Sequence, residues 1–170
     1  DWAGQDANIE ILYNPVELHK FDHPAKRVKR VSDGSTTVLM MGEIGERKGA
    51  FDLLKTVPDV LEAVPTSRFR FAGNGETDAL KAMAHELGVS EQVDVMGWTA
   101  GEDKLEAFQT ADVYCLPSYA ENLPVSILEA MGARLPVIST PVAGTPEAVI
   151  EGETGFLVQP GDLSALTNRL

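Results

Sequence analysis

The feature that most constrains the fold is a regular alternation of short apolar runs with amphipathic stretches. The apolar runs predict strands at 9–13, 36–42, 68–73, 92–97, 112–118, 135–140 and 155–158. The amphipathic stretches predict helices at 48–64, 76–88, 101–111, 123–133, 145–151 and 162–170, with Pro58 kinking or shortening the first. Apolar strands are buried on both faces, and strand–helix alternation gives a parallel sheet. We therefore expect an α/β fold with helices on both faces of the sheet.

Length and charge exclude several classes of protein. The 170 residues are enough for one domain with its own core. No apolar run approaches the ~20 residues that span a bilayer, and no signal-peptide pattern opens the chain, so we expect a cytoplasmic protein. A net charge of −12 argues against a nucleic-acid-binding surface, because binding to phosphates needs clustered lysine and arginine side chains. Because the chain opens on Asp1 without a methionine and closes on Leu170 inside a predicted helix, we expect a fragment of a longer protein.

Metal-ligand patterns are missing from the sequence. His19, His23 and His85 have no metal-ligand spacing, and there is no His-Glu-x-x-His or Cys-x-x-Cys motif. No Asp-x-Asp pair is present to hold a nucleotide-chelating divalent ion. We therefore expect neither a metal nor a cofactor. The single Cys115 lies in an apolar segment and is expected to be a buried thiol.

Glycines and charged side chains gather in the loops that follow the predicted strands. These loops read MGEIGERKG, AGNGE, MGWTAGEDK, LPSYAENLP and STPVAGTPE. In open parallel sheets, ligands bind in the crevice beyond the carboxyl ends of the strands. We expect the functional site at this edge of the sheet.

The stretch ENLPVSILE, residues 121–129, carries two glutamates in an apolar context. Pro124 suits the first position of the predicted helix, and helical side chains tilt toward the N-terminus, so Glu129 would point back toward the loop. The rise from Pro124 to Glu129 is ~7.5 Å, about the distance from a phosphate to the ribose of one nucleotide. Helix N-terminal N–H groups suit phosphates, and a carboxylate suits vicinal hydroxyls. The alternative is that Glu121 is an ordinary helix-start acid and Glu129 a solvated surface residue.

The loop GEIGERKG places Arg47 and Lys48 where the chain enters a helix. Two cations beside free backbone N–H groups would form a diphosphate clamp, although the P-loop pattern is not met. The alternative is a solvated basic pair. Trp98 follows a strand and either stacks on a nucleobase or is packed against its neighbours.

Taken together, these loops resemble those of a known family. The order strand–G-x-x-x-x-x-KG–helix, strand–G-x-G and strand–GW is followed by ADVYCLPSYAENLPVSILEAMGARLPVIST and ETGFLVQPGD. It resembles the large retaining glycosyltransferase family of GT-B fold, and within it the C-terminal, nucleotide-sugar-binding domain. The opening ILYNPVELHKF is similar to the start of that domain, so the resemblance covers about residues 9–162. It implies a Rossmann-like sheet that is one half of a GT-B fold, over 1–170.

The resemblance implies roles for individual residues. Glu121 would lie beside the donor sugar and its departing phosphate as the catalytic residue. Glu129 would hold the ribose hydroxyls, and Lys48, with Arg47 as a second cation, would neutralise the diphosphate. The remaining donor-binding positions that it implies are Gly42, Asn122, Leu123, Val125, Trp98 and Thr99, the last two beside the base.

The sequence departs from the family pattern at three places. Glu43 stands where an arginine is common, which removes a cation from the expected diphosphate site. Pro124 replaces a frequent glycine, so one backbone donor is missing. Ala133-Arg134 replaces a small-residue–glycine pair at a tight turn.

The resemblance implies transfer of a hexosyl group from a nucleoside diphosphate sugar, in polysaccharide or glycoconjugate synthesis. The acceptor, a glycan, lipid or other small molecule, would bind through an N-terminal domain absent from this chain, and the whole protein could associate peripherally with a membrane. Two alternatives stay open. One is a non-catalytic nucleotide-sugar-binding module, favoured by Glu43. The other is a dinucleotide-dependent oxidoreductase, which lacks the expected G-x-G-x-x-G turn.

Overall fold

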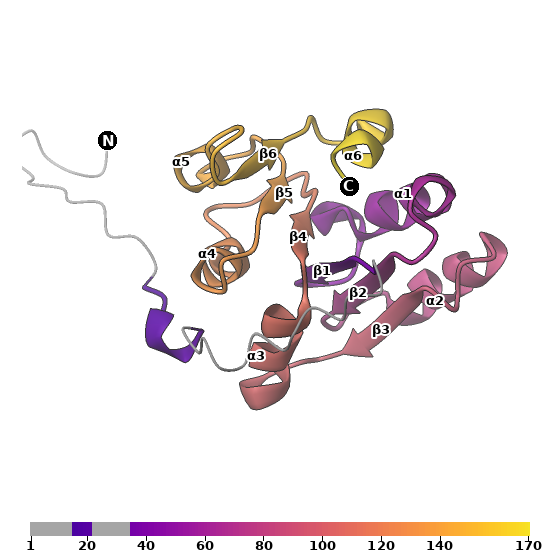
Figure 1. Ribbon diagram of the computed structural model, residues 1–170, viewed down its shortest axis with the longest axis horizontal. Coiled ribbons are helices and arrows are strands. Elements are labelled where there is room, and N and C mark those ends of the chain that lie inside the picture. Colours follow the sequence, from indigo (N-terminus) through magenta and orange to yellow (C-terminus); the bar gives the residue numbers. More distant parts are fainter. Residues whose placement is uncertain (1–14, 22–34) are drawn as a thin grey trace, which may run out of the picture.

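The computed structural model describes residues 15–21 and 35–170, and the predicted strand 9–13 lies outside them. Its centre is a six-stranded sheet in which every neighbouring pair is parallel. The strand order is β3-β2-β1-β4-β5-β6 (Figure 1). The strands are β1 (Thr37–Met41), β2 (Arg68–Ala72), β3 (Val93–Gly97), β4 (Val113–Leu116), β5 (Val137–Ser139) and β6 (Gly155–Leu157).

Helices cover both faces of the sheet, which confirms the predicted α/β class. They are α1 (Ala50–Ala63), α2 (Thr77–Glu86), α3 (Gly101–Thr110), α4 (Val125–Gly132), α5 (Thr145–Ala148) and α6 (Leu163–Arg169), with single 3-10 turns η1 (Leu18–Lys20) and η3 (Glu46–Lys48). Figure 1 shows α1, α2 and α6 on one face and α3 and α4 on the other. No helix in residues 15–21 and 35–170 is long and apolar enough to cross a membrane.

The central strands β1 and β4 form because their side chains are apolar on both faces of the sheet. In β1, Val38, Leu39 and Met40 are fully buried, and β4 buries Tyr114 beside them. The Tyr114 hydroxyl donates a hydrogen bond to the carbonyl of Met41 at 3.0 Å. Burial raises the pKa of Tyr114, so the phenol stays protonated and keeps this donor at the end of β1.

Three expectations about helix boundaries were wrong. The helix α1 continues through Pro58 to Ala63, because its apolar face, including Leu54, Val57 and Val60, is buried and holds it against the sheet. Pro124 precedes the first helical residue, Val125, as an extended cap and does not occupy the first helical position. The helix α5 also ends at Ala148, three residues before the predicted end.

The strand order places the predicted functional loops at a topological switch point. From β1 the chain proceeds outward to β2 and β3, then returns to β4 on the other side of β1 and proceeds outward to β5 and β6. Connections on the two sides of β1 and β4 therefore diverge, and a crevice opens beyond their carboxyl ends. The loops after β1 and β4 border that crevice.

Candidate active site

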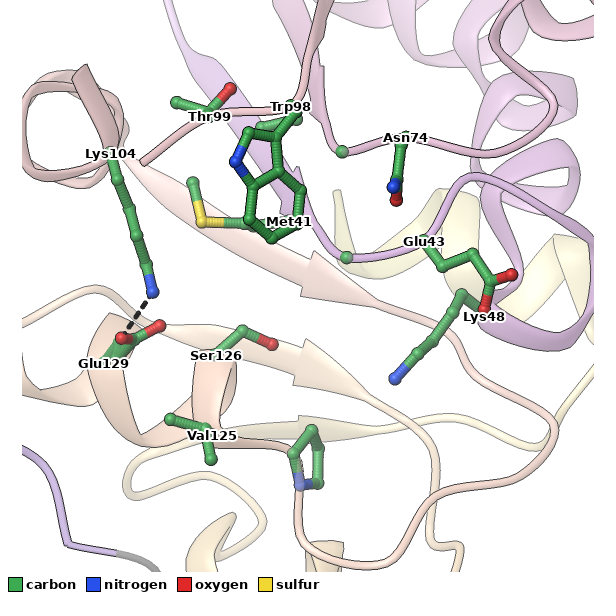
Figure 2. A pocket seen from close by; sticks show the side chains of 14 residues that line it. Met41, Glu43, Lys48, Asn74, Trp98, Thr99, Lys104, Val125, Ser126 and Glu129 are labelled. Carbon is green, nitrogen blue, oxygen red and sulfur yellow. Dashed lines mark hydrogen bonds and ion pairs between the residues drawn. The ribbon is translucent and has the colours of Figure 1, made fainter. Parts of the chain in front are cut away.

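A cavity of about 260 Å³ lies at the switch point, beyond the ends of β1, β2 and β3 and against the start of α4. We refer to it as the switch-point cavity. Figure 2 shows Lys48 and Glu43 toward one end and an ion pair of Lys104 and Glu129 at the other. The lining residues are Met41, Gly42, Glu43, Lys48, Ala72, Gly73, Asn74, Trp98, Thr99, Lys104, Pro124, Val125, Ser126 and Glu129.

Two glycines allow the loops around the cavity to pack tightly. Gly49, between η3 and α1, has φ 71°, and a Cβ there would lie 2.1 Å from the carbonyl oxygen of Pro117 in the loop after β4. Gly73, after β2, has φ 152°, and a Cβ there would lie 1.7 Å from the carbonyl oxygen of Gly42. Only glycine fits both the backbone angle and the close approach. The loops after β1, β2 and β4 therefore form one packed rim.

Lys48 and Glu121 form an ion pair across this rim. The Lys48 Nζ lies 2.5 Å from the Glu121 Oε1, and their side chains are only 15% and 6% exposed. The Ser118 hydroxyl donates to the same Oε1 at 2.7 Å, and the Thr140 hydroxyl holds the Ser118 carbonyl at 2.6 Å. Glu121 is therefore fixed beside the lysine that borders the cavity, and it is not a solvated acid at a helix start.

Glu129 forms the second ion pair of the site. Its Oε1 accepts from the Lys104 Nζ of α3 at 2.6 Å, and its side chain is 13% exposed. Both side chains line the switch-point cavity. The position in α4 agrees with the expectation that Glu129 points back toward the loop end of the helix. It excludes the alternative of a solvated residue on an exposed face.

Arg47 lies outside the lining of the switch-point cavity. Its Nη2 is 3.0 Å from the Glu43 Oε2, and its Nη1 donates to the Ala120 carbonyl at 3.3 Å. Glu43 lines the cavity and Arg47 does not. The structure thus brings Lys48 to the cavity but ties Arg47 to its outer edge, where the guanidinium compensates the Glu43 carboxylate.

The cavity lining also includes Trp98 and Thr99, from the loop after β3. Trp98 is 76% exposed, so the interpretation of a packed tryptophan does not hold. The Thr99 hydroxyl donates to the Gly97 carbonyl at 3.0 Å, which fixes the turn that presents the indole. An aromatic ring open to solvent at the cavity mouth is suited to stacking on a flat ligand.

The remaining predicted positions belong to the loop before α4 and to its first turn. Val125 lines the cavity, with Pro124 and Ser126 beside it. Asn122 and Leu123 lie outside the cavity lining, and the Asn122 carbonyl accepts from the Gly144 N–H at 2.8 Å. That bond anchors the loop and leaves the first N–H groups of α4 at the cavity, where a helix N-terminus favours an anion.

Sequence reasoning missed Lys104, Ser118, Asn74 and Ser126. A signal existed for Lys104, because the loop MGWTAGEDK mixes acids and bases at the predicted functional edge. No pattern pointed to Ser118, whose role depends on the three-dimensional position of Glu121.

Each cation at the site is paired with a carboxylate. Lys48, Lys104 and Arg47 are matched by Glu121, Glu129 and Glu43. An anionic ligand must therefore share cations that the protein already pairs, with help from the α4 N-terminus. Within residues 15–21 and 35–170, no group of three or more His, Cys, Asp and Glu side chains could hold a metal ion.

Comparison with known proteins finds a family model, related sequences and solved structures that match this chain. The model of the family described as "Glycosyl transferases group 1" matches residues 22–170. A phosphatidyl-myo-inositol mannosyltransferase of Mycobacterium leprae is 33% identical over 136 residues, which cover 79% of this chain and 36% of that protein. The chain therefore spans little more than a third of that relative.

Two solved structures share the fold. The Anabaena protein HepE, in complex with UDP and glucose, has a TM-score of 0.81 at 22% identity, over 94% of this chain and 45% of HepE. The C-terminal domain of a glycosyl transferase group 1 family protein from Francisella tularensis has a TM-score of 0.78 at 21% identity, over 91% of this chain and 85% of that domain.

Proposed function

Because this chain belongs to the glycosyl transferases group 1 family, we propose that it binds a nucleoside diphosphate sugar as the donor half of a retaining glycosyltransferase. One observation carries the proposal. A single cavity offers Lys48 and the α4 N-terminus at one end and the Glu129 carboxylate at the other. Cations and helix N–H groups suit the diphosphate, and a carboxylate suits the ribose hydroxyls.

The base of the nucleotide lies beside Trp98 and Thr99 in this proposal. The exposed indole offers a face for stacking, and the turn after β3 is fixed by the Thr99 hydrogen bond. One cavity thus offers a cation for the diphosphate, a carboxylate for the ribose and an aromatic ring for the base. HepE was solved with UDP and glucose, which supports a nucleotide-sugar ligand for the shared fold.

Lys48 and Glu121 act at the bond that breaks. In the transfer, the bond between the sugar carbon and the diphosphate oxygen breaks, an acceptor hydroxyl oxygen bonds to the same carbon, and the hydroxyl proton passes to the departing diphosphate. Charge builds up on the departing diphosphate, where Lys48 and the α4 N–H groups stabilise it. Glu121, held by Lys48 and Ser118, lies at the sugar end and responds to the positive charge that develops on the sugar. The site operates without a metal in this proposal.

A second candidate is a non-catalytic module that binds nucleotide sugars. The observation in its favour is Glu43, which lines the cavity where the diphosphate would bind. Both candidates bind the donor, and only the enzyme transfers the sugar. The acceptor binds to a part of the longer protein outside this chain, and polysaccharide or glycoconjugate synthesis is the proposed setting.

Calorimetric titration of residues 1–170 with UDP, GDP and ADP tests donor binding. We expect saturable one-to-one binding of at least one of them, and no sugar transfer by this chain alone. If none of the three binds to the folded chain, the proposal fails. Robust transfer by 1–170 alone would show that the site is complete and not half of one. Donor-dependent transfer by the longer protein decides between the enzyme and the non-catalytic module.

A further inference from the structure

A second cavity lies on the other side of the Lys104–Glu129 pair. It measures about 430 Å³ and is bordered by the segment 15–21, α3 and α4. Lys104, Val125 and Glu129 line both cavities. The ion pair is therefore part of the wall between them.

Glu129 could thus face either of two spaces. In the second cavity, Lys20 offers a competing cation, which in the structure is paired with Glu17. The bond from Lys104 Nζ to Glu129 Oε1 holds the carboxylate at the wall that the two cavities share. A partly buried carboxylate without this partner would lose its principal compensation and would turn toward another cation.

The pairing leaves one oxygen of Glu129 available. Lys104 takes Oε1 at 2.6 Å, and Oε2 has no partner among residues 15–21 and 35–170. A carboxylate that is fixed through one oxygen presents the other in a defined direction. The Glu129 side chain is then already ordered before a ligand binds, which lowers the entropic cost of binding.

We propose that Lys104 is a positioning residue, which holds Glu129 against the switch-point cavity so that its free oxygen receives the ribose hydroxyls of the donor. The inference rests on the proposed function, because it needs a ribose at Glu129. Lys104 acts through Glu129 and does not contact the nucleotide. Its effect must therefore disappear when either Glu129 or the ribose hydroxyls are removed.

The test is calorimetry on the chain 1–170 with the tightest-binding of UDP, GDP and ADP and with its 2′,3′-dideoxy analogue. Lys104→Met should weaken binding of the ribonucleotide roughly three- to tenfold. Binding of the dideoxy analogue should not change. Lys104→Arg should restore most of the loss, and adding Lys104→Met to Glu129→Gln should have no further effect. Lys55→Met is the matched control, because Lys55 is also an ion-paired lysine but lies outside the cavity lining.

Four results of this titration would overturn the proposal. An equal loss for both nucleotides would show that Lys104 touches the base or phosphates. Unchanged binding would show that Glu129 needs no positioning, and tighter binding would show that Lys104 competes with the ribose. If the unaltered chain binds both nucleotides equally, the ribose role of Glu129 fails, and this inference fails with it.

A measurement without ligand checks the pair itself. Urea unfolding of Lys104→Met, Glu129→Gln and the double variant forms a double-mutant cycle. We expect a non-additive result, in which the double variant is more stable than the two single losses predict. Additive losses would mean that the two side chains are not coupled, which would overturn the positioning role whatever the nucleotide does.

Discussion

Lys48 and Glu121 are 73 positions apart in the chain, and their charged atoms lie 2.5 Å apart. Lys48 ends the turn after β1, and Glu121 belongs to the loop after β4. Since both side chains are largely buried, the lysine is not a freely solvated cation. A diphosphate that binds at the cavity must share Lys48 with Glu121, and the predictions for these two residues differ for that reason.

Lys48→Met should weaken binding of a nucleoside diphosphate by roughly ten- to a hundredfold, because a hydrogen bond from a charged donor contributes about 1.5–3 kcal/mol. The loss should be much smaller for the corresponding nucleoside monophosphate, which lacks the β-phosphate. Calorimetry with both ligands measures this difference. Lys55→Met, outside the cavity lining, is the control and should bind as the unaltered chain does. Equal losses for the two ligands would place Lys48 away from the β-phosphate.

The two glutamates should respond differently to the same substitution. Glu129→Gln should weaken nucleoside diphosphate binding by roughly ten- to a hundredfold, because the ribose hydroxyls lose a charged acceptor. Glu121→Gln should bind at least as tightly as the unaltered chain, because the amide no longer competes for Lys48. In the longer protein, Glu121→Gln should instead lower turnover. Circular dichroism checks that both variants fold. If neither substitution changes binding or turnover, the site is misassigned.

Glu43→Gln should tighten nucleoside diphosphate binding roughly three- to tenfold at low salt, because a carboxylate that lines the cavity repels the phosphates. The gain should shrink as the salt concentration rises. Glu46→Gln makes the same charge change in the same turn, at an exposed position outside the cavity lining, and should have little effect. An equal gain in both variants would mean that net charge, and not the position of Glu43, controls affinity.

Nucleoside diphosphate binding should not depend on a divalent ion, because lysines and the α4 N-terminus are proposed to supply the positive charge. Titrations with excess chelator and with added Mg²⁺ should give the same dissociation constant within about twofold. A large loss of affinity on chelation would reveal a metal site and contradict the proposal.

Arg134 has φ 62°, in the left-handed region, directly after α4 and the residue that caps it. A residue with a Cβ atom destabilises this conformation by about 1–2 kcal/mol relative to glycine. Part of that difference is offset, because glycine loses more conformational entropy on folding. Arg134→Gly should therefore be more stable than Arg134→Ala by about 1 kcal/mol. Comparing these two variants isolates the Cβ atom, because both lose the guanidinium. Urea unfolding measures the difference, and equal stabilities would mean that the turn carries no strain.

Much of the fold was predictable because it depends on local patterns. The short runs rich in apolar residues predicted the six described strands, and the glycine-rich loops predicted the edge where the cavity lies. The predicted end of α1 was close to the observed one, but the expected shortening at Pro58 does not occur, because burial of Leu54 and Val57 outweighs the local effect of the proline. The side-chain partners at the site were not predictable in this way. The pairing of Lys104 with Glu129 depends on how α3 and α4 pack, and that of Arg47 with Glu43 on the shape of one turn.

The contact between Gly49 and the Pro117 carbonyl has a consequence for protein engineering. Because a Cβ would lie 2.1 Å from that oxygen, the turn after β1 and the loop after β4 can only be shaped together. Tyr119 reinforces the joint, since its N–H donates to the Arg47 carbonyl at 2.9 Å. A chimera that exchanges one of these segments with a relative would combine mismatched surfaces. Recombination intended to change the donor should therefore exchange residues 42–49 and 117–124 together, although about seventy residues separate the two segments in the sequence.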